Sequence, residues 1–217
     1  MQSKKVKKNI IQAPMGETRV LLHTCCAPCS SAIIEAMMQN GITPVIYYCN
    51  PNIFPKEEYE IRKEECTRYA QALGLEIVDA DYDHENWLEA MKGLEGEPER
   101  GGRCLKCFKL RLLRTAQYAR ERGIKVITTT LASSRWKSLD QINEAGRWAC
   151  DTLASMHESG RMHETIPPEE RDVIWWDQNW RKGGLQERRL QIIKEYDFYN
   201  QLYCGCEFSM PKETSQQ

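Results

Sequence analysis

The chain lacks several features that would assign it to a common class of protein. No run of 18 or more apolar residues occurs among its 217 residues, so no segment is long enough to span a membrane as a helix. The basic N-terminal stretch has no apolar segment of the kind that secretory signals carry. Neither GxGxxG nor GxxxxGK(S/T) occurs, so no nucleotide-binding loop is recognisable. We therefore expect a cytoplasmic protein without membrane contacts.

Length and composition indicate one folded domain. The residues are 41% hydrophobic and 28% charged, which is typical of a globular protein with one sizeable core. Residues 1–18 are basic and polar, and we expect them to form a flexible tail. We predict a single α/β catalytic domain over residues 19–209 and a C-terminal tail over residues 210–217.

Apolar, β-branched runs alternate with amphipathic stretches along the chain. Strands are predicted over residues 19–25, 43–50, 76–82, 125–132 and within 172–180, and helices over residues 30–41, 56–75, 84–94, 104–123, 138–156 and 184–199. This alternation predicts a Rossmann-like α/β fold, with a parallel sheet of about five strands and flanking helices. Such folds bind ligands beyond the carboxyl ends of their strands, so we expect a metal site there.

Ten cysteines are the most distinctive feature of the composition. Seven fall into three groups, which are CCxxC at Cys25, Cys26 and Cys29, CxxC at Cys104 and Cys107, and CxC at Cys204 and Cys206. The remaining three stand alone, and we interpret Cys49, Cys66 and Cys150 as buried, inert thiols. Thiols stay reduced in the cytosol, where grouped cysteines indicate a metal site or catalysis more often than a disulfide.

One interpretation of the first group is a redox dithiol. The sequence CAPC at residues 26–29 follows a predicted strand and begins a helix, and a helix N-terminus lowers thiol pKa values. Two observations count against this interpretation. The second CxxC and the CxC pair have no role in a simple dithiol mechanism. The chain also continues with βα units, whereas a thioredoxin fold ends in a hairpin and a helix.

A metal centre would use all three groups. Cys104 and Cys107 are neighbours on one helical face, and the glycine between Cys204 and Cys206 lets the backbone bend around a site. Adjacent residues at a strand end point to opposite sides, so the two adjacent thiols of the first group are expected to reach different centres. A structural zinc and a [4Fe-4S] cluster each need four thiolates, and spacing alone favours neither.

Charge is distributed unevenly along the chain. Residues 57–99 are strongly acidic, whereas residues 100–125 carry nine Lys or Arg and one acid. A run of like charge commonly forms a solvated face, but a basic helix that begins at a cysteine pair favours an anionic partner. A zinc-stabilised RNA-binding module without catalysis is therefore an alternative to an enzyme.

Six motifs together resemble those of one known family. They are LLHTCCAPCSS, YYCNPNIFPKEEYEIRKEE, EPERGGRCLKCFKLRLLRTA, TTLASSRWKSLDQIN, NWRKGG and YCGCEFS, in this order over about residues 19–209. They resemble the QueH-type epoxyqueuosine reductases. The resemblance implies an oxidoreductase that reduces epoxyqueuosine at the wobble position of certain tRNAs to queuosine. This reaction is the last step of queuosine biosynthesis, and in this family it needs no cobalamin.

The resemblance also implies cofactors and site residues. The family carries a [4Fe-4S] cluster next to a single iron ion, and six positions match its ligands, namely Cys25, Cys26, Cys104, Cys107, Cys204 and Cys206. Some relatives have aspartate at the position of Cys29, which is therefore expected to bind the lone iron. Cys25, Cys26 and Cys29 are the predicted catalytic residues. Epoxide reduction takes two electrons from an external donor, and the lone iron is expected to act as a Lewis acid on the epoxide oxygen.

A tRNA substrate requires contacts to phosphates and bases. The predicted tRNA-binding residues are Arg103, Lys106, Arg135, Lys137, Arg181 and Lys182. The last two precede a predicted helix, whose N-terminal N–H groups favour an anion. The candidates for base stacking are Trp136, Trp175, Trp176 and Trp180, although core packing is favoured for Trp175 and Trp176. Packing is also favoured over a role as proton donor for His23, Tyr47 and Tyr48.

Overall fold

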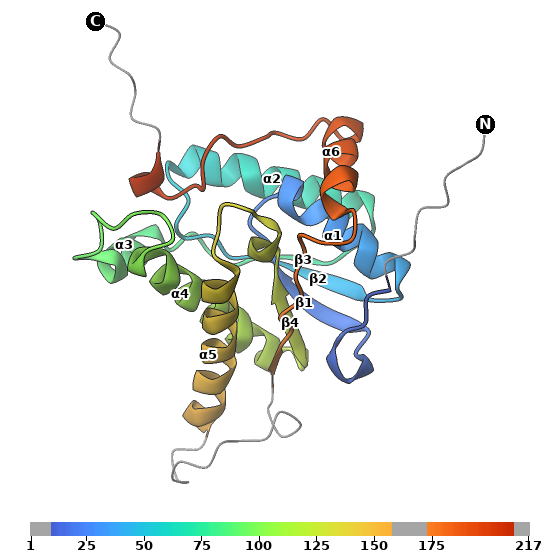
Figure 1. Cartoon of the computed structure of the whole chain (residues 1–217), viewed down its shortest axis with the longest axis horizontal. Coiled ribbons are helices and arrows are strands. Elements are labelled where there is room, and N and C mark those ends of the chain that lie inside the picture. Colours follow the sequence, from blue (N-terminus) through green and yellow to red (C-terminus); the bar gives the residue numbers. More distant parts are fainter. Residues whose placement is uncertain (1–9, 158–172, 211–217) are drawn as a thin grey trace, which may run out of the picture.

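Five strands form a single parallel sheet in the computed structural model, which describes residues 10–157 and 173–210 (Figure 1). The strands are β1 (Arg19–His23), β2 (Thr43–Tyr48), β3 (Ile77–Asp79), β4 (Val126–Thr129) and β5 (Ile174–Trp175). Their order across the sheet is β3-β2-β1-β4-β5, and each neighbouring pair is parallel. This arrangement confirms the predicted Rossmann-like α/β fold. The predicted tail residues 1–9 and 211–217 lie outside the described residues.

The central strands are apolar on both faces. Leu21 of β1 is fully buried, and it lies opposite Val45 of β2 and Ile127 of β4, which are also buried. A parallel strand that is covered on both faces reads as a continuous apolar run, because neither face meets water. This is the pattern from which the strands were predicted.

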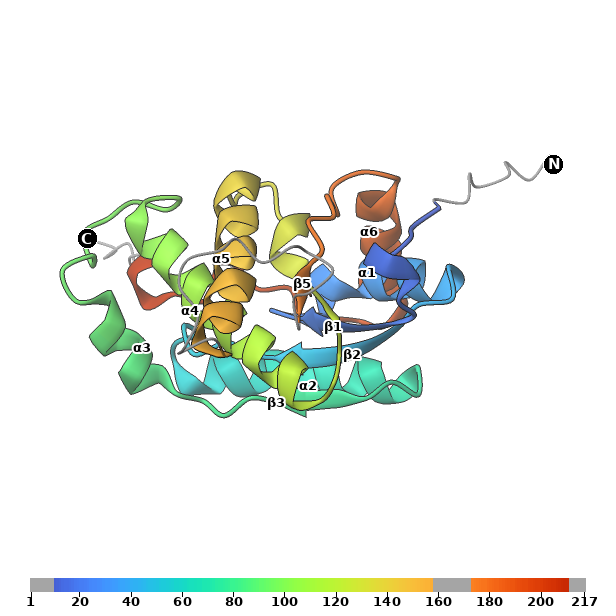
Figure 2. The ribbon, with the colours of Figure 1, turned by 90° about the horizontal axis from the view of Figure 1, so that it is seen from below.

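Helices cover the sheet (Figure 2). They are α1 (Ala27–Gln39), α2 (Lys56–Ala72), α3 (His84–Met91), α4 (Gly102–Glu121), α5 (Leu139–His157) and α6 (Leu185–Glu195). Helix α1 packs against α2 and α6, and α4 packs against α5. Both views place α4 with α5 on one side of the molecule and α1 with α6 on the other. Within the described residues, no helix combines the length and apolarity that crossing a bilayer requires.

The direction of winding reverses at β1. The chain moves from β1 outward to β2 and β3, then returns to the other side of β1 to form β4 and β5. Open α/β sheets bind ligands in the crevice at such a reversal, beyond the carboxyl ends of the strands. At this edge β4 turns into a short 3₁₀ helix, Thr130–Ser133. The turn forms because Oγ1 of Thr129 accepts a hydrogen bond from the Leu131 N–H (3.2 Å).

Residues 10–18 do not form the solvated tail that their sequence suggests. Ile11 and Ala13 are buried in the main core. The Ile11 N–H donates to Oδ1 of Asn40 at the end of α1 (3.2 Å). These apolar residues stand among polar neighbours without a helical or strand period, so their partners are not recognisable from sequence. The core therefore begins before β1.

Candidate metal centre and active-site cavity

The first cysteine group lies directly after β1. The strand ends at His23, and α1 begins at Ala27. The Sγ atoms of Cys25, Cys26 and Cys29 all lie within 4.8 Å of one another, which is close enough for one metal ion. Thr130, which follows β4, accepts a hydrogen bond from the Cys25 N–H (3.2 Å), and its hydroxyl lies 3.4 Å from the Cys25 Sγ. The group is therefore anchored between β1 and β4.

Strand alternation predicted that Cys25 and Cys26 point to opposite sides, but their side chains lie together. Their Sγ atoms are 3.8 Å apart. The prediction fails because both residues lie beyond the last residue of the strand. Cys26 is the N-cap residue of α1, with φ −171° and ψ 159°, so its side chain follows the helix entry and not the pleat of the sheet. The two thiols belong to one group.

The second pair lies at the beginning of α4. Cys104 and Cys107 stand in the first two turns of this helix. Cys107 is buried in a small cluster that is separate from the main core and that consists of Trp87, Met91, Cys107 and Cys206. Cys204 packs against this cluster. The start of α4 therefore contacts the C-terminal cysteine pair, about a hundred residues later in the chain.

A segment that returns across the molecule after α6 carries the third pair. We call residues 199–206 the strap; it runs along α2 towards α3 (Figure 1). Arg62 of α2 is 3% exposed and donates to the carbonyls of Tyr203 and Cys204 (3.3 Å each). The same guanidinium pairs with Glu58 (2.6 Å), which also accepts a hydrogen bond from the Tyr199 hydroxyl (2.7 Å). A buried ion pair thus fixes the strap upon α2.

The turn between the two strap cysteines requires glycine. Gly205 has φ +101°, a conformation that residues with a side chain rarely adopt. A Cβ atom at Gly205 would lie 2.9 Å from Cγ1 of Ile53 and 3.0 Å from Nη1 of Arg62. The strap is paired here with the loop after β2, because the Phe54 N–H donates to the Gly205 carbonyl (2.8 Å). Close packing of two backbones places Cys206 in its cluster.

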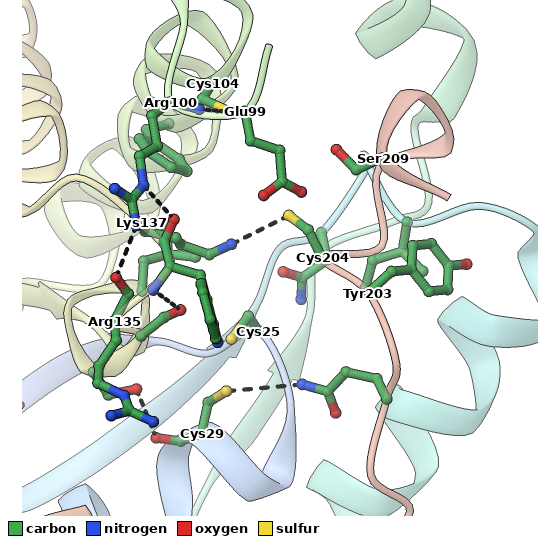
Figure 3. A pocket seen from close by; sticks show the side chains of 18 of the residues that line it. Cys25, Cys29, Glu99, Arg100, Cys104, Arg135, Lys137, Tyr203, Cys204 and Ser209 are labelled. Carbon is green, nitrogen blue, oxygen red and sulfur yellow. Dashed lines mark hydrogen bonds between the residues drawn. The ribbon is translucent and has the colours of Figure 1, made fainter. Parts of the chain in front are cut away.

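One cavity of about 540 Å³ joins the three groups, a size within the range of small-molecule sites. Its lining includes Cys25 and Cys29 of the first group, Cys104 of the second and Cys204 of the third. Figure 3 shows these four thiols around the same opening. Sequence reasoning predicted all seven grouped cysteines as ligands, and each group contributes to this cavity.

Lys137 lies beside Cys204, one of the two strap thiols, and lowers its pKa. Its Nζ lies 3.2 Å from the Cys204 Sγ (Figure 3). Burial alone would raise the pKa of Cys204, but the positive charges of Lys137 and Arg111 outweigh it and lower the pKa. The thiolate, which is the form that binds metals, is therefore favoured at Cys204.

Hydrogen bonds within the first group favour a single thiolate. The pKa of Cys25 lies well below its usual value because Cys26 and Cys29 donate to it. Burial raises the pKa of Cys26, and donation to Cys25 raises the pKa of Cys29 to about 12. These shifts make Cys25 the most acidic of the three thiols.

Arg103, a predicted tRNA contact, is occupied inside the protein. It is 2% exposed, and its guanidinium donates to the carbonyls of Leu94 (3.3 Å), Glu95 (2.7 Å) and Glu97. It also stacks over the ring of Phe208. The guanidinium of Arg103 thus holds the loop before α4 in place and is not available to bind phosphate. We therefore omit Arg103 from the proposed tRNA surface.

The other predicted tRNA contacts differ in their surroundings. Lys106, Arg135 and Lys182 are exposed. Arg181 is half-buried, and its Nη2 donates to the Lys137 carbonyl (2.8 Å). The Lys137 ammonium faces a thiol in the cavity. Three of the six predicted residues are therefore placed as surface cations.

The predicted packing residues lie in the core. His23 donates from Nε2 to the Cys49 carbonyl (3.0 Å), its Nδ1 lies 2.6 Å from Oγ1 of Thr129, and burial lowers its pKa to about 3. Tyr47 stacks on Tyr118, and the Tyr48 hydroxyl donates to a backbone carbonyl. Among the candidate stacking residues, Trp176 and Trp180 are buried and Trp175 is half-buried, whereas Trp136 is 73% exposed at the cavity rim.

Sequence reasoning missed three polar residues around the thiols. They are Arg62, Arg111 and Gln201, whose Nε2 lies 2.9 Å from the Cys26 Sγ. Arg111 is buried and donates to the Cys49 carbonyl and to the Asn50 side chain. A signal existed for Arg111, because it stands four residues after Cys107 and hence on the same face of α4. No local signal marks Gln201, which reaches the site through the path of the strap.

The donor set fits thiolate-bound metals. Burial raises the pKa of Cys104, and the neighbouring Cys204 and Cys107 raise it further. Burial, Cys204 and Cys107 likewise raise the pKa of Cys206 to about 11. Cys104, Cys107, Cys204 and Cys206 are four thiols, the number that a zinc ion or a [4Fe-4S] cluster uses. The first group offers three further thiols, which leave room for a non-protein ligand.

Fold and site together define a Rossmann-like α/β protein with a group of three cysteines that could hold a metal ion. Comparison with known proteins narrows this class. Residues 20–212 match the family model described as "Epoxyqueuosine reductase QueH". The chain therefore belongs to the epoxyqueuosine reductase QueH family, whose members are oxidoreductases.

Three relatives illustrate the match, and each is named an epoxyqueuosine reductase QueH. The protein of Histophilus somni is 46% identical over 200 residues, which cover 92% of this chain and 75% of the relative. The protein of Haemophilus influenzae is 44% identical with the same coverage. The protein of Thermotoga maritima is 34% identical over 194 residues, which cover 88% of this chain and 90% of the relative.

Proposed function

We propose that the protein reduces the epoxide of epoxyqueuosine in tRNA to the alkene of queuosine. The observation that carries this proposal is the single cavity to which three distant cysteine groups contribute thiols. The reaction takes two electrons and two protons and releases the epoxide oxygen as water. The electrons come from an external donor. We propose a cytoplasmic location, since the seven grouped cysteines are not in disulfides and reduced thiols persist there.

We propose a division of the seven thiols between two centres. Cys104, Cys107, Cys204 and Cys206 would hold the [4Fe-4S] cluster, because Cys107, Cys204 and Cys206 share one small cluster and Cys104 lines the same cavity as Cys204. The first group would hold the lone iron, because its three Sγ atoms lie within 4.8 Å of one another. These centres supply one-electron transfer and Lewis acidity, so the proposed reaction needs no cobalamin.

The protein's own residues bind and orient the substrate. Arg135 and Trp136 lie at the cavity rim, where a cation and an exposed indole suit a phosphate and an unstacked base. The exposed Lys106 and Lys182 would add phosphate contacts. A base must leave the stack of the anticodon loop to reach the thiols, and the cavity volume of about 540 Å³ suits one modified nucleoside.

Anaerobic purification of the full chain tests this function directly. Iron and acid-labile sulfide are measured first, and tRNA carrying epoxyqueuosine is then incubated with the protein and a low-potential reductant. Mass spectrometry of the digested nucleosides should show conversion to queuosine. A colourless protein that contains zinc and leaves the tRNA unchanged would instead support the zinc-stabilised RNA-binding module.

A further inference from the structure

The loop that carries Lys137 is held from two sides. Arg100 donates from Nε to the Trp136 carbonyl (2.8 Å) and from Nη2 to the Arg135 carbonyl (3.1 Å). Arg181 donates to the carbonyl of Lys137 itself (2.8 Å). Three hydrogen bonds to successive carbonyls fix the backbone, so the direction of the Lys137 side chain follows from a rigid loop and not from a mobile surface chain.

The Lys137 side chain points into the cavity (Figure 3). Its Nζ donates to the Cys204 Sγ at 3.2 Å. A lysine side chain is ordinarily an ammonium ion at neutral pH, so Lys137 presents a positive charge directly to the sulfur of Cys204.

The other cations near the thiols have different partners. Arg111 directs its donors to Cys49 and Asn50. Arg62 directs its donors to Glu58 and to the backbone carbonyls of the strap. Among the described cationic side chains, Lys137 is thus the one that donates directly to a thiol of the proposed cluster set.

We infer that Lys137 is a positioning residue that donates a charge-assisted hydrogen bond to Cys204 and thereby raises the reduction potential of the cluster. This inference rests on the proposed function, because it concerns the cluster held by the α4 and strap cysteines. Reduction adds one negative charge to the cluster, and a cation 3.2 Å from a ligand sulfur stabilises that charge. Hydrogen bonds to the sulfurs are an established determinant of such potentials. A cavity screens the interaction less than bulk water does.

A potentiometric titration tests the inference. The full chain is purified anaerobically with its metals, and the cluster is titrated while its visible absorption and EPR signal are recorded. In Lys137→Met the ratio of reduced to oxidised cluster at a given potential should fall about tenfold, which is ~59 mV for a one-electron couple. Lys137→Arg keeps both charge and donor, and its potential should stay close to that of the unchanged protein.

Two further variants control for charge and for folding. Lys125→Met removes one positive charge from an exposed residue at the amino end of β4, and it should leave the potential unchanged. Lys137→Gln keeps an N–H donor without the charge, and its potential should fall between those of Lys137→Met and the unchanged protein. Thermal unfolding of each variant reports whether the fold is retained.

The possible outcomes distinguish a failure of the inference about Lys137 from a failure of the proposed function. If the protein without any substitution contains no iron and sulfide after anaerobic purification, the proposed function itself is refuted. A loaded Lys137→Met protein with an unchanged potential would overturn the inference and leave the function standing. If both neutral variants fold but fail to load, while Lys137→Arg loads, Lys137 is needed for assembly and the inference is again overturned.

Discussion

Replacing Gly205 with alanine should displace the strap cysteines while the α/β core stays folded. The change adds one methyl group at φ +101°, 2.9 Å from Cγ1 of Ile53 and 3.0 Å from Nη1 of Arg62. The backbone strain is worth about 1–3 kcal/mol, and overpacking of a tight contact about 1–3 kcal/mol more. The strap lies outside the helices and the sheet and is held to α2 by side-chain hydrogen bonds, so we expect the strap and not the α/β core to relieve this strain, by moving away from α2.

Movement of the strap removes two thiols from the site. Gly205→Ala, purified anaerobically, should therefore lose most of its iron and sulfide, while its circular dichroism stays that of the unchanged protein. Gly41→Ala is the matched control, since it has φ +76° and open space around the added methyl group. It should lower Tm by about 2–4 °C for each kcal/mol of strain and keep its metal. A Gly205→Ala protein with full iron and sulfide would refute the reasoning.

Three further changes test the site. Cys104→Ser should remove the broad visible absorption and abolish epoxyqueuosine reduction. The control Cys150→Ala, at a buried position away from the cavity, should keep both. Full iron and sulfide in Cys104→Ser would disprove the ligand assignment. Lys182→Ala should reduce the slope of log affinity for tRNA against log salt by about 0.7–0.9, and an unchanged slope would exclude this phosphate contact. Cys29→Asp should retain the lone iron and measurable turnover, since iron accepts oxygen and sulfur ligands, while Cys29→Ala should lose that iron but keep the cluster. An inactive aspartate variant with its iron intact would instead support the dithiol mechanism.

Local sequence patterns predicted most of the fold because the sheet is parallel and buried. Strands such as β1 are continuous apolar runs, and their alternation with amphipathic helices leaves few possible topologies. The ends of elements were harder to predict. The run over residues 125–132 predicts one strand, but Oγ1 of Thr129 accepts a hydrogen bond from the Leu131 N–H, and the chain turns into a 3₁₀ helix. A side-chain hydrogen bond of this kind has no periodic signature.

The basic helix shows why the site was only partly predictable. The sequence of α4 places two cysteines on one helical face, and its basic residues predicted a single phosphate-binding face. Arg103 and Arg111 are instead buried on the face that carries Cys107. Their partners are carbonyls of the 94–97 loop and residues 49–50, which come from other parts of the chain. A charged residue can be placed on a buried face only when such distant acceptors are known.

The path of the strap explains why the site depends on the complete fold. The first group lies between β1 and α1, which are adjacent in sequence, whereas the α4 and strap cysteines meet only through a segment that begins after the last helix. The strap reaches α4 because Arg62 and Ile53, both from the segment after β2, hold its backbone. Lys137, from the loop after β4, then contacts the strap thiol. Segments that follow β1, β2, β3 and β4 thus converge at one edge of the sheet, so the charge and spacing of the thiols are properties of the parallel topology and not of any single motif.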